Sequence, residues 1–226
     1  MKPWQEEVWC LPSANAEFVA AMEHILDVYE RPYDPKHPKV CFDESSKQLI
    51  EQTRLPAKPG QVQRVDYEYR RMGTRNLFMF FEPLAGRRHI EVTDRRTAQD
   101  FAHQMRWLVD VAYPDAECID VVLDNLNTHK PAALYETFEP AEANRILRRL
   151  AFHYTPRHGS WLNMAEIEFS VLMRKLGAHV PNDAALRRKA AAIESARNQA
   201  HSTVRWQFTS PDARIRLAQL YPSIPD

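Results

Sequence analysis

The chain has 226 residues, in which 30 Lys and Arg balance 30 Asp and Glu, so its formal net charge is zero. This length suits one large domain or two small ones, with enough residues for a substantial hydrophobic core. A domain that grips nucleic acid unaided usually carries a basic excess. Any such contact here must therefore come from local basic clusters or from another module.

The cysteines and the N-terminus exclude several classes of protein. Cys10, Cys41 and Cys118 lie far apart and form no CxxC pair, which argues against a structural zinc site and favours reduced thiols. The first residues lack the apolar core of a signal peptide, and no stretch is long enough to cross a membrane. The sequence therefore predicts a soluble intracellular protein without a membrane partner.

The first part of the chain predicts one helix followed by strands. Helical spacing of apolar residues indicates a helix over residues 14–30 with Ser13 as its N-cap, and three prolines mark 31–38 as a linker. Strands are expected at residues 39–43, 76–82 and 87–93. The last two form a hairpin through residues 83–86.

A long helix and a buried strand come next. The helix should run from Thr97 to about Tyr113. Its inward-facing residues are expected to be Phe101, Met105, Leu108 and Val111. Residues 118–123 form an unbroken apolar run, typical of a strand that is buried on both faces.

The remaining elements alternate between helices and strands. The expected helices cover residues 131–138, 141–150, 162–176, 183–201 and 211–220, and the expected strands cover 151–154 and 204–208. Antiparallel strands followed by alternating helices and strands predict the α/β class, with a mixed sheet flanked by helices on both faces.

Three carboxylates occupy positions suited to metal binding. Asp43 and Asp124 each end an apolar strand-like run, and Glu166 lies one turn into the helix that follows Ser160. Strands that deliver carboxylates to the rim of a sheet hold them rigidly. Three such groups, brought together, bind two divalent cations for phosphoryl transfer.

Two other acids compete for these roles. Glu168 is two residues from Glu166 and must point to nearly the opposite side of the helix. Glu166 is favoured because it shares a face with apolar residues expected to lie on the sheet, including Phe169. Glu44 adjoins Asp43 on a strand and points away from it, so it is interpreted as an orienting or salt-bridging partner.

The motifs around these acids resemble those of a known family. Residues 41–44, 123–129 and 153–166 are similar to the DDE transposases of the IS630/Tc1/mariner superfamily, the IS630 branch above all. Shorter similarities continue to the C-terminus, so the resemblance covers nearly the whole chain. It implies an RNase H-like fold in which Asp43, Asp124 and Glu166 are catalytic and hold two Mg²⁺ or Mn²⁺ ions.

The resemblance also implies a reaction and its partners. The expected reaction is strand cleavage at the ends of an insertion sequence, followed by transfer of the 3′-hydroxyl to target DNA, in the bacterial cytoplasm at the nucleoid. A homodimer assembled on DNA is expected. Because residues 1–38 supply only one helix and a linker before a catalytic domain at 39–226, a helix-turn-helix module is expected upstream or in trans. A catalytically silent regulator and an RNase H-like nuclease with another DNA substrate remain alternatives.

Residues beside the acids are candidates for DNA contact. Asn125, Asn127 and His129 could touch the phosphate backbone or could cap the helix that follows Pro131, and both interpretations stay open. The second set precedes the helix of Glu166 and consists of Arg157, His158, Ser160 and Trp161. These residues could hold backbone and stack a base on the indole, although Trp161 equally suits a core position.

Overall fold

The computed structural model describes residues 15–54 and 65–223. Five strands form one sheet in the order β3-β2-β1-β4-β5. Their bounds are β1 (Lys39–Arg54), β2 (Val65–Glu82), β3 (Arg87–Thr93), β4 (Ile119–Leu123) and β5 (Leu150–Tyr154). The first three strands pair antiparallel, whereas β1 with β4 and β4 with β5 pair parallel. The expected α/β class with a mixed sheet is confirmed.

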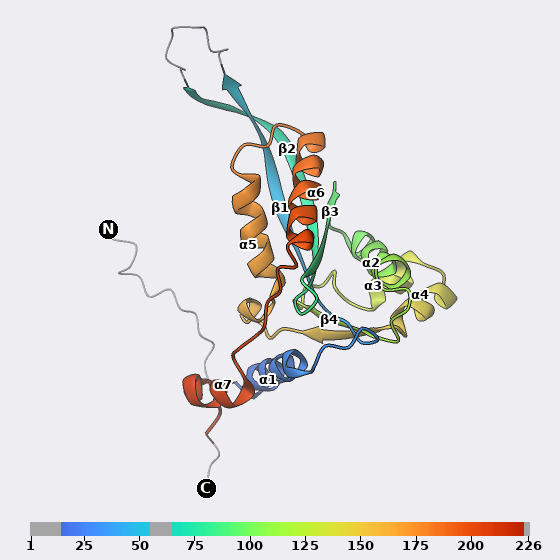
Figure 1. Ribbon diagram of the computed structural model, residues 1–226. Coiled ribbons are helices and arrows are strands. Elements are labelled where there is room, and N and C mark those ends of the chain that lie inside the picture. The colour runs from blue at the N-terminus through green and yellow to red at the C-terminus, as the bar shows by residue number, and fades with distance from the viewer. Residues whose placement is uncertain (1–14, 55–64, 224–226) are drawn as a thin grey trace.

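Helices cover both faces of the sheet (Figure 1). One face carries α1 (Ala16–Glu30), α5 (Ala165–Leu176), α6 (Asp183–Gln199) and α7 (Ser210–Arg216). The other face carries α2 (Ala98–Trp107), α3 (Ala132–Thr137) and α4 (Pro140–Leu147). Short turns of other helix types are η2 (Leu108–Ala112), η3 (Ser160–Leu162) and η4 (Ala218–Leu220). No helix in the described part of the chain is long and apolar enough to cross a membrane.

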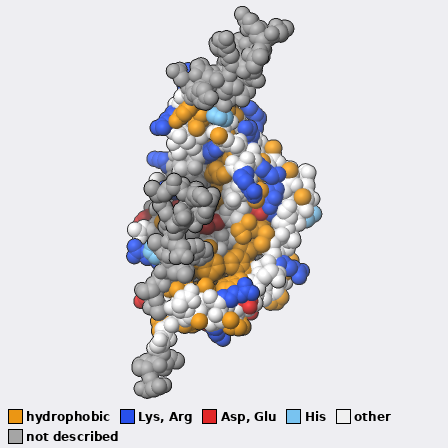
Figure 2. Space-filling model, turned by 90° about the vertical axis from the view of Figure 1, so that its left-hand side faces the viewer, with side chains coloured by type: hydrophobic (Ala, Val, Ile, Leu, Met, Phe, Trp, Pro, Cys, Tyr) orange, Lys and Arg blue, Asp and Glu red, His pale blue; other side chains and the backbone are white. Residues whose placement is uncertain are grey.

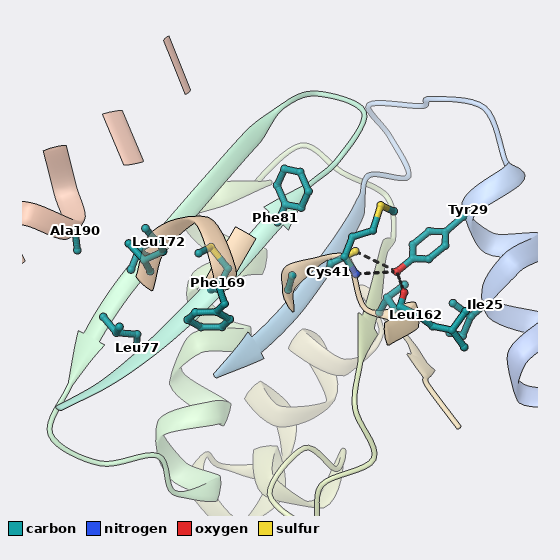
Figure 3. Close-up of a cluster of buried hydrophobic side chains, with 14 of the residues drawn as sticks. Ile25, Tyr29, Cys41, Leu77, Phe81, Leu162, Phe169, Leu172 and Ala190 are labelled. Atoms are coloured by element: carbon teal, nitrogen blue, oxygen red, sulfur yellow. Dashed lines mark hydrogen bonds between the residues drawn. The ribbon is translucent and has the colours of Figure 1, made fainter. Parts of the chain in front are cut away.

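Tyr29 fastens α1 to the segment that leads into α5 (Figure 3). Its hydroxyl donates a hydrogen bond of 2.6 Å to the carbonyl oxygen of Leu162 and lies 3.4 Å from the Sγ atom of Cys41 on β1. Burial raises the pKa of Tyr29 well above its usual value, so the hydroxyl keeps its proton and remains a donor. This helix therefore shares a core with β1 and α5.

The two longest strands extend beyond the rest of the sheet as a two-stranded ribbon (Figure 1). β1 pairs with β2 from Cys41 to Arg54, whereas β3 pairs only with residues 76–82 of β2. The sequence indicated much shorter strands at these places. Most described side chains of the ribbon are polar or exposed, and Leu49 is the buried one among them, so the ribbon has no apolar alternation that would predict a strand.

One helix end and the phase of one helix differ from the expectation. Asn15 caps α1 by accepting a hydrogen bond of 2.8 Å from the Glu17 N–H, whereas the expected cap, Ser13, lies outside the described residues. Val111 is 63% exposed, not buried as expected. Residues 108–112 form a π-helical turn, whose wider spacing rotates Val111 outward and brings Ala112 inward.

Two expectations near the C-terminus also change. The helix expected from residue 162 begins at Ala165, because a 3₁₀ turn intervenes. Residues 204–208 alternate between half-buried and exposed but join no strand of the described sheet. The half-buried members are Val204, Trp206 and Phe208, which pack on the core. Core packing alone produces the alternation that suggested a strand.

Candidate active site

Strand alternation directs Asp43 to the side of the sheet that α5 covers. Cys41 belongs to the core beneath α5, and Phe42 belongs to the core on the opposite face. Successive side chains of a strand point to opposite faces, so Asp43 faces α5. Asp124 comes directly after β4, and its charge helps to raise the pKa of Asp43.

Asn163 ties the start of α5 to the backbone beside Asp43. Its side chain is 2% exposed and donates a hydrogen bond of 2.8 Å from Nδ2 to the carbonyl oxygen of Phe42. Its Oδ1 atom accepts from the Ala165 N–H at 3.1 Å. Glu166, the second residue of α5, is exposed and comes next along the chain. Sequence patterns assigned Asn163 no role, although an asparagine just before a helix is a recognised capping signal.

Asp43 lies in an environment that disfavours its negative charge. Burial raises the pKa of Asp43 to about 7; a hydrogen bond of 2.8 Å from the Glu44 N–H opposes this shift, and the charges of Glu44, Asp124 and Glu166 add to it. No cation of the described residues forms an ion pair with Asp43. The surroundings of this carboxylate therefore favour an added cation.

His129 joins the second aspartate to Glu44. Its Nδ1 atom lies 2.6 Å from Asp124 Oδ1, and its Nε2 atom forms an ion pair of 2.8 Å with Glu44 Oε2, at an angle unsuited to a hydrogen bond. Burial alone would lower the pKa of His129, but the two carboxylates outweigh it and raise the pKa to about 9. The imidazole is therefore protonated at neutral pH, and it orients Asp124.

His129 is 1% exposed, so the DNA contact expected for it is not available in this arrangement. The sequence could not reveal its burial, because the ring packs against Phe42 and Phe101, which lie far away in the chain. The expectation that Glu44 acts as a salt-bridging partner agrees with its ion pair to His129.

Glu168 occupies a different environment from Glu166. Its side chain is 1% exposed and forms ion pairs of 3.1 Å with Arg88 of β3 and 2.6 Å with Arg197 of α6. Both carboxylate oxygens of Glu168 are engaged by guanidinium groups. The two glutamates of α5 point in different directions, as helix geometry requires. Glu168 is the buried one and Glu166 is exposed, so the expectation that Glu166 lies on the face packed against the sheet is wrong.

Most of the candidate DNA contacts line one groove beside Asp124. The groove has a volume of ≈ 580 Å³ and includes, besides Asp124, the side chains of Asn125, Asn127, Arg157, His158 and Ser160. Two hydrogen bonds hold its loops together, from Thr155 N–H to the Leu123 carbonyl at 2.9 Å and from the Tyr154 hydroxyl to the His129 carbonyl at 2.8 Å. The structure thus joins loops that lie about 30 residues apart in the sequence.

Trp161 and the two asparagines can be assigned more closely. Trp161 is 40% exposed and stacks on Trp206, with ring centroids 6.4 Å apart, so it is neither fully core nor free. α3 begins after Pro131 without a side-chain cap. Asn125 and Asn127 are exposed, and the capping role considered for them is not observed.

The donor set fits a hard divalent cation, although the carboxylates stand apart. Among the described residues, no three His, Cys, Asp or Glu side chains converge closely enough to ligate one ion. Like charges repel, so three carboxylates that come together need positive charge among them. Carboxylate oxygens are the ligands that Mg²⁺ and Mn²⁺ prefer, and the raised pKa of Asp43 marks the shortage of positive charge that such an ion would relieve.

Comparison with known families and structures agrees with this arrangement. The family described as DDE superfamily endonuclease matches residues 38–187, which include all three acids. No curated protein matches the sequence.

Solved structures of a mariner transposase share the fold. The Mos1 mariner paired-end complex with Mn matches with a TM-score of 0.59 at 13% identity, covering 89% of this chain and 62% of that one. The Mos1 strand transfer complex matches with a TM-score of 0.58 at 13% identity, covering 82% and 55%. The paired-end complex with Mg gives 0.55 at 13% identity, covering 98% and 68%. The RNase H-like fold is confirmed, and the chain spans about three fifths of the length of the first of these proteins.

Proposed function

The chain belongs to the DDE superfamily endonuclease family, and we propose that it is the catalytic domain of a metal-dependent transposase. In this proposal it cleaves DNA strands at the ends of an insertion sequence and transfers the resulting 3′-hydroxyl to target DNA. The observation that carries the proposal is Asp43, a half-buried carboxylate whose nearest charges are other carboxylates. Such an environment is typical of a metal-binding active site.

Asp43, Asp124 and Glu166 are the proposed ligands of two Mg²⁺ or Mn²⁺ ions. When bound, such ions activate a water or a 3′-hydroxyl and stabilise the leaving oxygen. His129 holds Asp124 at 2.6 Å and Asn163 holds the first turn of α5, so both act as positioning residues. Similar structures described as complexes with Mn and with Mg support the choice of metal.

The groove beside Asp124 is the proposed seat of the DNA backbone. Its amide, guanidinium, imidazole and hydroxyl groups come from Asn125, Asn127, Arg157, His158 and Ser160. Groups of these kinds commonly bind phosphate oxygens. Because the net charge of the chain is zero, we propose that sequence selection comes from a helix-turn-helix module upstream or in trans. The likeness to paired-end complexes supports a homodimer on DNA.

Nicking of supercoiled plasmid DNA tests the proposal. The wild-type chain should convert the plasmid to open circles with Mn²⁺ or Mg²⁺ and not with a chelator, and Asp43→Asn, Asp124→Asn and Glu166→Gln should each remove this activity. Glu136→Gln, which alters an exposed glutamate of α3, is the matched control. Equal nicking by the wild type and Asp43→Asn would refute the assignment.

Strand transfer needs a separate measurement. A labelled oligonucleotide with a free 3′-hydroxyl should become joined to the plasmid, and the same oligonucleotide with a 3′-deoxy end should not. Nicking without joining would support the nuclease alternative, and metal-independent DNA binding without nicking would support the silent regulator.

A further inference from the structure

A second groove lies between the end of α1 and the extended segment at residues 203–209. It has a volume of ≈ 810 Å³, and its lining includes Arg31, Tyr33, Arg205, Trp206 and Gln207. Figure 2 shows one face of the molecule, on which apolar side chains gather in the lower half and Lys and Arg side chains lie above and below them. Neither the family match nor the three acids accounts for this groove.

Stacked aromatic rings connect this groove to the active-site groove. Trp161 directly follows Ser160, which lines the groove beside Asp124. The Trp161 ring stacks on Trp206 with an interplanar angle of 22°, and Trp206 lines the second groove. Tyr29 supports Trp206 from the core, with ring centroids 5.2 Å apart. A half-exposed indole with a rigid backing offers a face on which an unpaired base can stack.

The polar groups of the second groove suit phosphate oxygens. The Arg31 side chain is 50% exposed and lies 3.4 Å from Asp120. Arg205 is exposed and forms no ion pair with the described residues. Guanidinium groups bind phosphate in a fork geometry, and Gln207 adds an amide. One acid, Glu30, also lines the groove, so its lining carries two guanidinium groups and one carboxylate.

We infer that this second groove holds the DNA strand on one side of the phosphate that is cut. The strand would pass from the groove beside Asp124 across Trp161 and would place its next phosphates near Arg31 and Arg205. This inference rests on the proposed function. DNA is the occupant that the observations favour, because the groove continues the proposed path of the backbone and joins it through stacked rings rather than through a closed apolar pocket.

Binding of DNA with single-stranded extensions tests the inference without any chemistry. Fluorescence anisotropy with Ca²⁺ would compare a short duplex with the same duplex carrying a 5′ or a 3′ extension of about six nucleotides. One of the two extensions should tighten binding. Arg205→Gln and Trp161→Ala should each weaken binding of the extended duplex by about five- to tenfold. Both variants should affect binding of the blunt duplex less. Arg148→Gln, an exposed arginine on the opposite face of the sheet, is the matched control.

Photo-crosslinking locates the extension directly. An oligonucleotide with 5-iodouracil in the favoured extension should crosslink to Trp161, Trp206 or Tyr33, and one with 5-iodouracil in the duplex should not. The inference is overturned if neither extension tightens binding, if Arg148→Gln and Arg205→Gln have equal effects, or if an oligoglutamate competes as well as the single strand. Because these assays need no cleavage, a failure of the proposed nuclease activity would be seen separately in the plasmid assay.

Discussion

Asp43 is half-buried and Glu168 is buried near α5, and their charged surroundings are opposite. Glu168 lies between Arg88 and Arg197, and each of its oxygens meets a guanidinium group. Asp43 has carboxylates for neighbours, and its pKa is raised to about 7, first by burial and then by those charges. The fold thus places cationic side chains beside Glu168 and carboxylates beside Asp43.

This contrast separates an acid that maintains the fold from one suited to bind a ligand. A buried ion pair becomes costly when one partner is removed, because the other charge stays buried and unpaired. An ionised, partly buried carboxylate without a nearby positive charge lowers the stability of the fold, and binding of a cation removes that cost. Sequence spacing alone makes Glu166 and Glu168 similar candidates for a metal ligand. The charged side chains around each of them in the structure distinguish the two.

Replacing Asp43 should have the largest effect, on strand cleavage. Asp43→Asn removes a charged ligand of the proposed ions while preserving the shape of the side chain, and we expect the rate of Mn²⁺-dependent nicking to fall at least about 10⁴-fold, or about 5.5 kcal/mol. Glu168→Gln, assayed below its melting temperature, should retain measurable nicking. Loss of nicking in Glu168→Gln but not in Asp43→Asn would mean that the wrong glutamate, and the wrong face of α5, had been assigned to the active site.

Replacing Glu168 should have the largest effect on stability. Glu168→Ala leaves the guanidinium groups of Arg88 and Arg197 without their shared carboxylate, which should lower the free energy of unfolding by about 4 kcal/mol. The matched variant Glu166→Ala, on the exposed side of the same helix, should change it by less than about 0.5 kcal/mol. Urea denaturation with a chelator measures both. A loss for Glu168→Ala as small as that for Glu166→Ala would show that Arg88 and Arg197 do not need the Glu168 carboxylate for stability.

The raised pKa of Asp43 predicts a pH-dependent gain in stability for Asp43→Asn. The unfolded chain loses this proton near pH 3.8 and the folded chain near pH 7, so ionisation of Asp43 lowers the stability of the wild type as pH rises between these values. At pH 8 without metal, Asp43→Asn should be more stable on the order of 3 kcal/mol. Near pH 4 the two proteins should unfold alike. Denaturation curves from pH 4 to 8 with a chelator would show this divergence, and a constant difference across the range would contradict it.

Local patterns in the sequence predicted the acids and the elements that carry them. An apolar strand that ends on an aspartate, as at Asp43 and Asp124, is recognisable because all its signals lie within a few residues. The sheet class and the family followed from such segments. The helix of Glu166 was predicted with an error only at its start, where the 3₁₀ turn intervenes.

Partners that meet from distant parts of the chain could not be predicted. Glu44 meets His129, and Glu168 meets Arg88 and Arg197, only after the sheet and helices have packed. Contacts between such distant residues produce no periodic pattern in the sequence. The outward turn of Val111 likewise depends on one π-helical turn, which apolar spacing cannot reveal.

Magnesium should distinguish the two acidic environments through a smaller effect. A ligand that binds only the folded state raises stability by RT ln(1 + [L]/Kd), which is about 1.4 kcal/mol at ten times Kd. The wild type should gain this increment at pH 8, and Glu168→Gln should gain it from a lower baseline, because its proposed ligands are intact. Asp43→Asn should gain little, since it is already relieved of its buried charge and lacks the ligand. Urea denaturation with and without Mg²⁺ provides the measurement, with NaCl of matched ionic strength as the control. An equal gain in Asp43→Asn would mean that the ion binds elsewhere, and the shortage of positive charge around Asp43 would then have to be explained without a metal.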